Sequence, residues 1–277
     1  MGPDLHIHST ASDGTLTPEA IVERALEYGI PTIALTDHDT VAGVRRAQIA
    51  AEGTSLTVIP AVELSAEVGD RAIHILGYWI DHTDCLLNER LAVQRTKRLA
   101  RAERIVEALA ASNSGSVTMR DILDVASGAS IGRSHVAHAL MRAGHVSSIA
   151  DAFERYLGEG RPGYVRKTVP TPDEVIAWIR DAGGLPILAH PALSAVDDLI
   201  PDLVAAGLLG IEAYHAECST ADSVRYARMA DESGLLVTGG SDFHGDSRPA
   251  NQLGAALVPD GVLEALNMLR ASLGGAA

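Results

Sequence analysis

The sequence has few cysteines and no long apolar segment. Its two cysteines, Cys85 and Cys218, form no CxxC pair, so neither a disulfide framework nor a cysteine-based metal site is expected, and we expect the protein in a reducing cytoplasm. No apolar run reaches the roughly 18 residues that a membrane span needs. The chain opens with a strand-like segment that carries Asp4, His6 and His8, which is not the pattern of a signal peptide. The GxxxxGK[ST] motif is also absent from the sequence, so a phosphate-binding P-loop is not expected.

The balance of charge restricts the class of partner. A net charge of −14 disfavours a protein that coats nucleic acid. The charge is unevenly spread, because residues 90–180 contain more Lys and Arg than Asp and Glu, whereas the remainder is strongly acidic. Acidic side chains that hold cations, facing a basic segment that holds an anion, suit a phosphorylated substrate. Solvated helices that happen to be rich in Arg give the same pattern.

Hydrophobic periodicity indicates the fold class. At 277 residues with 47% hydrophobic content, the chain can form one large core plus a small insertion. Short apolar runs alternate with helical patterns, and seven runs are predicted as strands, near residues 4–8, 32–36, 56–63, 72–78, 185–190, 209–215 and 235–242. Such alternation predicts an α/β fold with a parallel sheet. We expect a distorted (β/α)7 barrel, with a doubly wound open sheet as the alternative.

The alternation is interrupted in the middle of the chain. From about residue 85 to residue 182 only helical periodicity is found, and the glycine- and proline-rich stretch 158–163 precedes the return of the strands. We therefore expect a barrel domain formed by residues 1–85 and 169–277. Residues 86–168 are expected to form a helical insertion that caps the substrate beside the barrel mouth.

Histidines and carboxylates cluster at the predicted strands. In barrels of this kind the active site lies at the carboxyl ends of the strands. A single histidine there usually has a structural role, and we assign such roles to His82, His138 and His145. Nine candidates at one face are hard to explain without cations, since neighbouring carboxylates repel one another. The candidate metal ligands are His6, His8, Asp13, His38, Glu63, His74, His190, Asp242 and His244.

These motifs together resemble a known family. His6-Ile7-His8 with Asp13-Gly14, Thr36-Asp37-His38-Asp39, Glu63, His74, Ala189-His190-Pro191 and Ser241-Asp242-Phe243-His244 are similar to the motifs of the PHP (polymerase and histidinol phosphatase) family of metal-dependent phosphoesterases. The mid-chain insertion resembles the branch of stand-alone enzymes that act on AMP, on nucleoside 3′,5′-bisphosphates and on RNA 5′ ends.

The resemblance implies three divalent metal ions, for which Mn, Fe and Zn are equally suitable. One ion would be held by His6, His8, Glu63 and Asp242. A second would share Glu63 and add His74 and His190, and the third would take Asp13, His38 and His244. The first strand and the loop after it would thus serve two different ions.

The resemblance also implies residues that bind the substrate. The insertion of that branch supplies a Gly-Arg-Pro-His and a Tyr-Val-Pro segment, and here these correspond to Gly132-Arg133-Ser134-His135 and Tyr164-Val165-Arg166-Lys167. Arg133, His135 and Lys167 are the resulting candidates for phosphate binding. In the sixth-strand motif His215 is retained, whereas Ala216-Glu217-Cys218 replace the usual proline and second histidine. His215 is a candidate donor of a proton to the leaving oxygen.

The expected function is hydrolysis of a phosphomonoester of a nucleotide, a nucleoside 3′,5′-bisphosphate or AMP, by attack of a hydroxide that bridges two metal ions. Glu63, His215 and Asp242 are the candidate catalytic residues. Stepwise 5′-to-3′ trimming of short RNA is a further expected activity. The alternatives are a histidinol-phosphate phosphatase, which shares the metal site, and a non-catalytic metal-stabilised module. No membrane partner and no obligate protein partner are expected.

Overall fold

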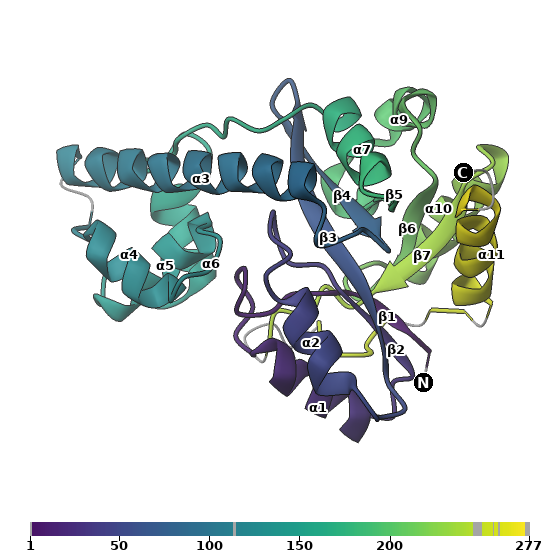
Figure 1. Cartoon of the computed structure of the whole chain (residues 1–277). Helices are drawn as coiled ribbons and strands as arrows, with labels where there is room; N and C mark the ends of the chain where they lie inside the picture. The colour runs from purple at the N-terminus through teal and green to yellow at the C-terminus, as the bar shows by residue number, and fades with distance from the viewer. Residues whose placement is uncertain (1, 113–114, 246–250, 257, 260, 275–277) are drawn as a thin grey trace.

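The structure is a nearly closed barrel with a helical arm. The computed structural model describes residues 2–112, 115–245, 251–256, 258–259 and 261–274. Seven strands follow one another in the sheet in sequence order, and Ile7 forms a bridge with Phe243, which brings the first and last strands together (Figure 1). The predicted (β/α)7 barrel is confirmed, and the sequential strand order differs from that of a doubly wound sheet. The strands are β1 (Asp4–Ile7), β2 (Thr32–Leu35), β3 (Thr57–Val68), β4 (Arg71–Tyr78), β5 (Leu185–Leu188), β6 (Gly210–His215) and β7 (Leu236–Gly240).

The prediction of an entirely parallel sheet is wrong at β4. This strand runs antiparallel to both β3 and β5, whereas the other neighbouring pairs are parallel. A parallel neighbour needs a long crossover, but only Gly69 and Asp70 separate β3 from β4. Gly69 has φ 62°, in the left-handed region that glycine adopts without strain. The two strands therefore form a hairpin. The hairpin also extends β3 to Val68, so Glu63 lies within the strand and not at its end as predicted.

Helices cover the outside of the barrel, and several begin at sequence signals. Thr17 accepts a hydrogen bond from the Ala20 backbone N–H, and Pro18 takes the first helical position. Capping boxes start the helices at residues 172 and 220. The covering helices are α1 (Pro18–Glu27), α2 (Val44–Ala51), α7 (Pro172–Asp181), α8 (Pro191–Ser194), the 3-10 turn η2 (Asp197–Leu199), α9 (Ile200–Ala206), α10 (Thr220–Glu232) and α11 (Val262–Gly274). Within the part of the chain that the structure describes, no helix combines the length and apolarity needed to cross a bilayer.

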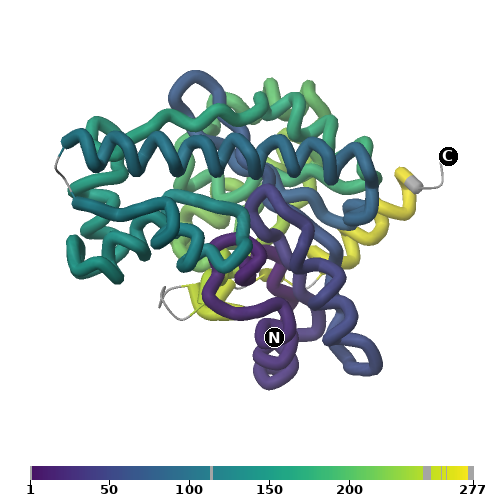
Figure 2. Tube along the Cα trace, turned by 60° about the vertical axis from the view of Figure 1, so that its left-hand side comes forward, coloured from purple at the N-terminus to yellow at the C-terminus, as the bar shows by residue number. Residues whose placement is uncertain are grey.

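The mid-chain helices form their own apolar cluster. They are α3 (Cys85–Ala111), α4 (Met119–Ala126), α5 (Arg133–Arg142), α6 (Ile149–Ala152) and the π-helical turn η1 (Phe153–Leu157). Leu87 and Leu91 at the start of α3 pack into the barrel core, whereas Ile105 and Leu109 near its end pack with the helices α4 to α6. The long helix α3 thus leaves the barrel and carries the other helices beside it (Figures 1 and 2). We retain residues 86–168 as the proposed insertion.

Candidate metal centre

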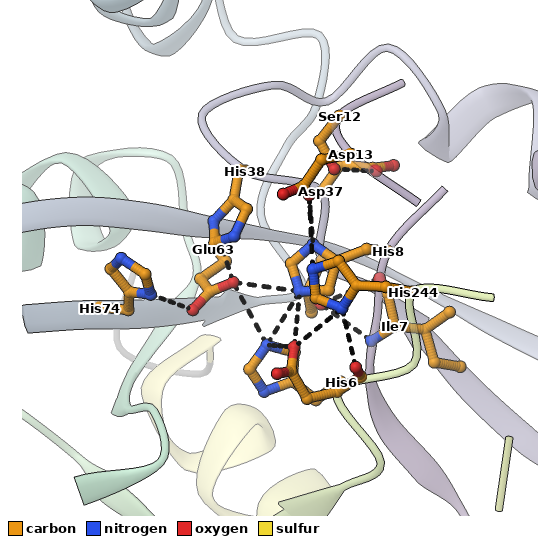
Figure 3. Close-up of polar contacts among 12 residues, drawn as sticks. His6, Ile7, His8, Ser12, Asp13, Asp37, His38, Glu63, His74 and His244 are labelled. Carbon is orange, nitrogen blue, oxygen red and sulfur yellow. Dashed lines mark hydrogen bonds and ion pairs between the residues drawn. The ribbon is translucent and has the colours of Figure 1, made fainter. Parts of the chain in front are cut away.

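The candidate ligands converge at one end of the barrel. Three groups of side chains bring their ligand atoms within 4.8 Å of one another. Figure 3 shows imidazoles and carboxylates from β1, β3, β4 and the loops after β2 and β7 pointing toward a common centre. The groups share members, and they are His6, His8, Glu63 and Asp242; His8, Asp13, His38 and His244; and His38, Glu63 and His74.

The first group is the most deeply buried. His6 Nε2 and His8 Nε2 lie 3.1 Å apart. Glu63 Oε2 is 3.3 Å from His6 Nε2 and 3.1 Å from His8 Nε2. Asp242 Oδ1 is 3.1 Å from His8 Nε2. Two imidazole nitrogens and two carboxylates that face one another in this way form the donor set that a divalent transition metal prefers.

Glu63 connects this group to a second one. Its other oxygen, Oε1, lies 2.7 Å from His74 Nδ1 and 3.1 Å from His190 Nε2. Burial acts to raise the pKa of Glu63, but the neighbouring His38, His74 and His6 hold it well below its ordinary value. Glu63 is therefore an ionised carboxylate placed between two sets of imidazoles, as a bridging ligand would be.

The third group lies on the side of Asp13. His244 Nε2 is 3.4 Å from Asp13 Oδ1, and the rings of His8 and His244 stack with centroids 4.0 Å apart. Burial raises the pKa of Asp13, but the facing His244 and His38 lower it more, to well below its usual range. Asp13 is thus also ionised and available to a cation.

Buried polar atoms without hydrogen bonds indicate whether these residues could bind metal ions. Buried nitrogen and oxygen atoms normally have hydrogen-bond partners. Among the described residues, four candidate ligands have a buried atom that makes no hydrogen bond: His8 Nδ1, Asp13 Oδ1, His38 Nδ1 and His74 Nδ1. Bound cations would satisfy these atoms, so the donor set fits a multinuclear metal site.

The backbone is strained at two of the ligands. His190 has φ 29° and Asp242 has φ 52°, values that side-chain-bearing residues rarely adopt. Such conformations cluster at functional sites, where the surrounding structure holds them. The strained backbone at His190 and Asp242 is therefore typical of a functional site in which the fold fixes the positions of the ligands.

Buried carboxylates outside the ligand set hold it in place. Asp37 accepts hydrogen bonds from the hydroxyls of Ser9 and Ser12, at 2.7 and 2.6 Å, and so fixes the loop that carries Asp13. Asp4 accepts from the backbone N–H of Ser241 at 2.8 Å, next to Asp242. Metal sites commonly depend on such supporting hydrogen bonds.

Glu212 is a supporting residue that the sequence reasoning missed. It is fully buried in β6, with Oε1 3.0 Å from His6 Nδ1 and Oε2 accepting from the His190 backbone N–H at 2.8 Å. The sequence feature that could have identified Glu212 is that it is a single carboxylate within the apolar run Leu209–Ala213. A charge inside a buried strand requires a partner, and here the partners are two candidate ligands.

Two of the three predicted phosphate-binding residues lie at a basic pocket between the barrel and the insertion, whereas His135 lines a neighbouring pocket with Asp13 and Ser134. Arg133 and Lys167 line the basic pocket, together with Arg98 and Arg101, which the sequence reasoning did not select. Burial, followed by the charges of Arg98, Arg133 and Arg101, lowers the pKa of Lys167 to about 8. Burial and the charges of Arg133 and Arg98 lower the pKa of Arg101 to about 10. Clustered cations with lowered pKa values favour a bound anion.

His135 and Ser134 have structural contacts at the start of α5. His135 Nδ1 accepts the Gly132 backbone N–H at 3.0 Å and so caps the helix. Ser134, which replaces the proline of the family motif, donates its hydroxyl to Asp13 Oδ2 at 3.1 Å. The insertion therefore contacts a candidate metal ligand directly.

His215 lies at the edge of the metal centre. Its Nδ1 accepts the Glu217 backbone N–H at 3.1 Å, which places a proton on Nε2, 3.8 Å from Asp242 Oδ2. The ring thus presents an N–H toward the centre.

Comparison with known proteins places this site in a family. The PHP domain model matches residues 4–157. The chain is 38% identical over 267 residues to the 5′-3′ exoribonuclease Rnm of Escherichia coli K12, covering 94% of this chain and 90% of that one. It is 34% identical over 261 residues to the 3′,5′-nucleoside bisphosphate phosphatase of Chromobacterium violaceum, covering 91% and 90%. A crystal structure from Bifidobacterium adolescentis, assigned as a metal-dependent phosphoesterase, superposes with a TM-score of 0.89 at 34% identity over 98% of this chain and 96% of that one.

The chain belongs to the PHP domain family. It is a hydrolase of phosphoester bonds with a metal-binding cluster of histidines and carboxylates.

Proposed function

We propose that this phosphoesterase removes a phosphate from a nucleotide, either a nucleoside 3′,5′-bisphosphate or AMP. The main support for this proposal is the position of the basic pocket beside the metal centre. Asp39, next to the ligand His38, lines this pocket together with Arg133 and Lys167. A phosphoryl group at the metal centre and an anionic group in the pocket can therefore belong to one small molecule.

Three divalent ions, Mn, Fe or Zn, are proposed for the centre. His6, His8, Glu63 and Asp242 would hold the first, Glu63, His74 and His190 the second, and Asp13, His38 and His244 the third. The first and third sets are each contained in a group of close ligand atoms, whereas the group around His74 contains Glu63 and His38 and not His190. The second set is supported by the 3.1 Å distance from His190 Nε2 to Glu63 Oε1 and by the ionised state of Glu63. Metal ions in such a site supply a nucleophilic hydroxide near neutral pH and neutralise charge on the phosphoryl oxygens.

The side chains of the protein have separate proposed roles. Glu63 and Asp242 would bind the ions as carboxylate ligands. Arg133, Lys167 and Arg101 bind an anionic group of the substrate, and His135 fixes the turn that carries Arg133. His215 donates the proton on Nε2 to the leaving oxygen, since its Nδ1 is occupied by the Glu217 N–H.

Stepwise 5′-to-3′ trimming of short RNA is a second candidate activity. The relative named 5′-3′ exoribonuclease Rnm is 38% identical over most of both chains, and its name supports this candidate. The cations of the pocket suit a 5′-phosphate as well as a mononucleotide phosphate. We place both activities in the same metal centre.

A substrate panel tests the proposal. The protein, supplied with Mn²⁺, is assayed on adenosine 3′,5′-bisphosphate, AMP, histidinol phosphate and a 5′-phosphorylated oligoribonucleotide. We expect kcat/KM for one of the nucleotides to exceed that for histidinol phosphate by at least about tenfold. A preference for histidinol phosphate, or inactivity on all four compounds in protein that binds metal, would overturn the proposal. Stepwise shortening of the oligonucleotide decides the second candidate.

A further inference from the structure

Arg98 lies at the point where α3 leaves the barrel. Leu91, two turns before it, belongs to the barrel core, and Ala102, one turn after it, belongs to the apolar cluster of the insertion. Figure 1 shows the helix passing from one body to the other. The Arg98 side chain is only 20% exposed, although it is charged. A largely buried arginine requires partners for its whole guanidinium.

Those partners come from three segments. Arg98 Nε donates to Asp39 Oδ2 at 2.7 Å, and Nη2 donates to the same oxygen. Nη2 also donates to Ser65 Oγ at 3.1 Å. Nη1 donates to the backbone carbonyl of Ile131 at 3.3 Å. One planar group therefore joins the loop after β2, the strand β3 and the turn before α5.

Each of these segments carries a residue of the proposed active site. Asp39 follows His38, and its own backbone N–H donates to the Glu63 carbonyl at 2.9 Å. Ser65 is two residues beyond Glu63, and its backbone N–H donates to Asp39 Oδ1 at 2.9 Å. Ile131 precedes Gly132 and Arg133. Arg98 thus contacts the supports of a metal ligand and of a phosphate-binding arginine at once.

Arg98 differs from the neighbouring basic residues in that its charge has a carboxylate partner. Its ion pair with the buried Asp39 neutralises it, whereas no carboxylate is within ion-pair distance of Arg101, Arg133 or Lys167 among the described residues. Those three cations remain for an anion. Asp39 has φ 50°, a strained value that its bonds to Arg98 and Ser65 hold in place.

We propose that Arg98 is a positioning residue that couples the phosphate pocket of the insertion to the metal centre. Through Asp39 it holds His38, a ligand of the Asp13–His38–His244 group. Through the Ile131 carbonyl it holds the turn that presents Arg133. Loss of the guanidinium therefore lowers metal occupancy and phosphate affinity together. The inference rests on the proposed function of both sites.

The test compares two arginines of the same helix. Arg98→Lys keeps the charge and removes the planar fork. Arg90→Lys is the matched control, because Arg90 also ties α3 to the barrel, through Asp181 at 3.0 Å, but away from the site. Metal content per chain is measured after dialysis against limiting Mn²⁺, and the affinity for inorganic phosphate is measured by calorimetry on the full chain. Thermal unfolding of each variant verifies that it is folded.

We expect Arg98→Lys to lose metal from one site, with about tenfold weaker Mn²⁺ binding there, and to bind phosphate about tenfold more weakly. Arg90→Lys should match the unsubstituted protein in both measurements. In Asp39→Asn the effect of Arg98→Lys should largely disappear, because the shared interaction is already broken.

Two results would overturn the coupling. Retention of full metal content with weaker phosphate binding would make Arg98 a simple phosphate ligand. Unchanged values in both measurements would leave the ion pair without a role at the site. Failure of the proposed function is distinguishable, since an enzyme that hydrolyses none of the nucleotides can still show the loss of metal in Arg98→Lys.

Discussion

Glu212 Oε1 lies 3.0 Å from Nδ1 of His6, and both side chains are fully buried. The carboxylate accepts a hydrogen bond from the Nδ1–H group, so the lone pair of His6 Nε2 faces His8, Glu63 and Asp242. The second oxygen of Glu212 holds the backbone of His190 at 2.8 Å. One side chain from β6 thereby orients ligands from β1 and from the end of β5, which are proposed to serve two different ions.

Glu212→Gln tests this relationship. The amide keeps the shape of the side chain but removes the charge that favours the Nδ1–H form of His6. We expect metal affinity or kcat to fall by about 10- to 100-fold. Glu19→Gln is the control, because Glu19 also pairs with a basic side chain, Arg46, but on the exposed surface. Equal metal affinity and activity in Glu212→Gln and in the unsubstituted protein would contradict the role.

The central ligands should be indispensable. Glu63→Ala removes the carboxylate that contacts His8 through one oxygen and His74 through the other. Asp242→Ala removes the partner of His6 and His8. We expect both variants to lose turnover, and retention of more than about a tenth of the normal rate in an initial-rate assay would exclude the bridging arrangement. His82→Ala, outside the cluster, should retain activity.

The convergence of the candidate ligands could be predicted from the order of the strands and from the residue types near their ends. His6 and His8 are two residues apart on a strand and so project to the same side. The parallel strands of a barrel bring their carboxyl ends to one face, so His8, His38 and His190 meet there. Glu63 and His74 instead reach that face from within the β3–β4 hairpin. That rule needs no contact information, so it predicts from the sequence the candidates at the ends of the parallel strands, but it does not account for the positions of Glu63 and His74.

The supporting residues were not predictable in the same way. Arg98 and Asp39 are 59 positions apart, and nothing local in either segment identifies the pair. Their contact depends on where α3 passes over the barrel, which is a property of tertiary packing. The direction of β4 was missed for a local reason, because the short Gly69-Asp70 turn predicts a hairpin and the regular alternation was given more weight.

The lowered pKa of Lys167 predicts a pH dependence. Burial and the charges of Arg98, Arg133 and Arg101 bring that pKa to about 8, with Asp39 opposing them. The ammonium is charged below this pH, so anion binding is strongest there and weakens as the pH rises through 8. We expect kcat/KM for a nucleotide to fall above pH 8 in the normal enzyme.

The variant Lys167→Met should lower kcat/KM at pH 7 and lack this decline. Arg166→Met is the control, because Arg166 is the adjacent residue but is 60% exposed and pairs with Glu67 and Asp70. It should keep the decline. A decline of the same size in Lys167→Met would assign the titration to another group.

Separate metal groups predict separable losses of metal. His74 contacts Glu63 Oε1 at 2.7 Å, whereas Asp13 pairs with His244 at 3.4 Å on the other side of the centre. We expect His74→Ala and Asp13→Ala each to lose about one ion per chain after dialysis, and the double variant to lose about two, because independent sites contribute additively. Elemental analysis of the purified proteins gives the count. If the double variant retains as much metal as either single variant, both residues serve the same ion, and the division of the ligands among three ions is wrong.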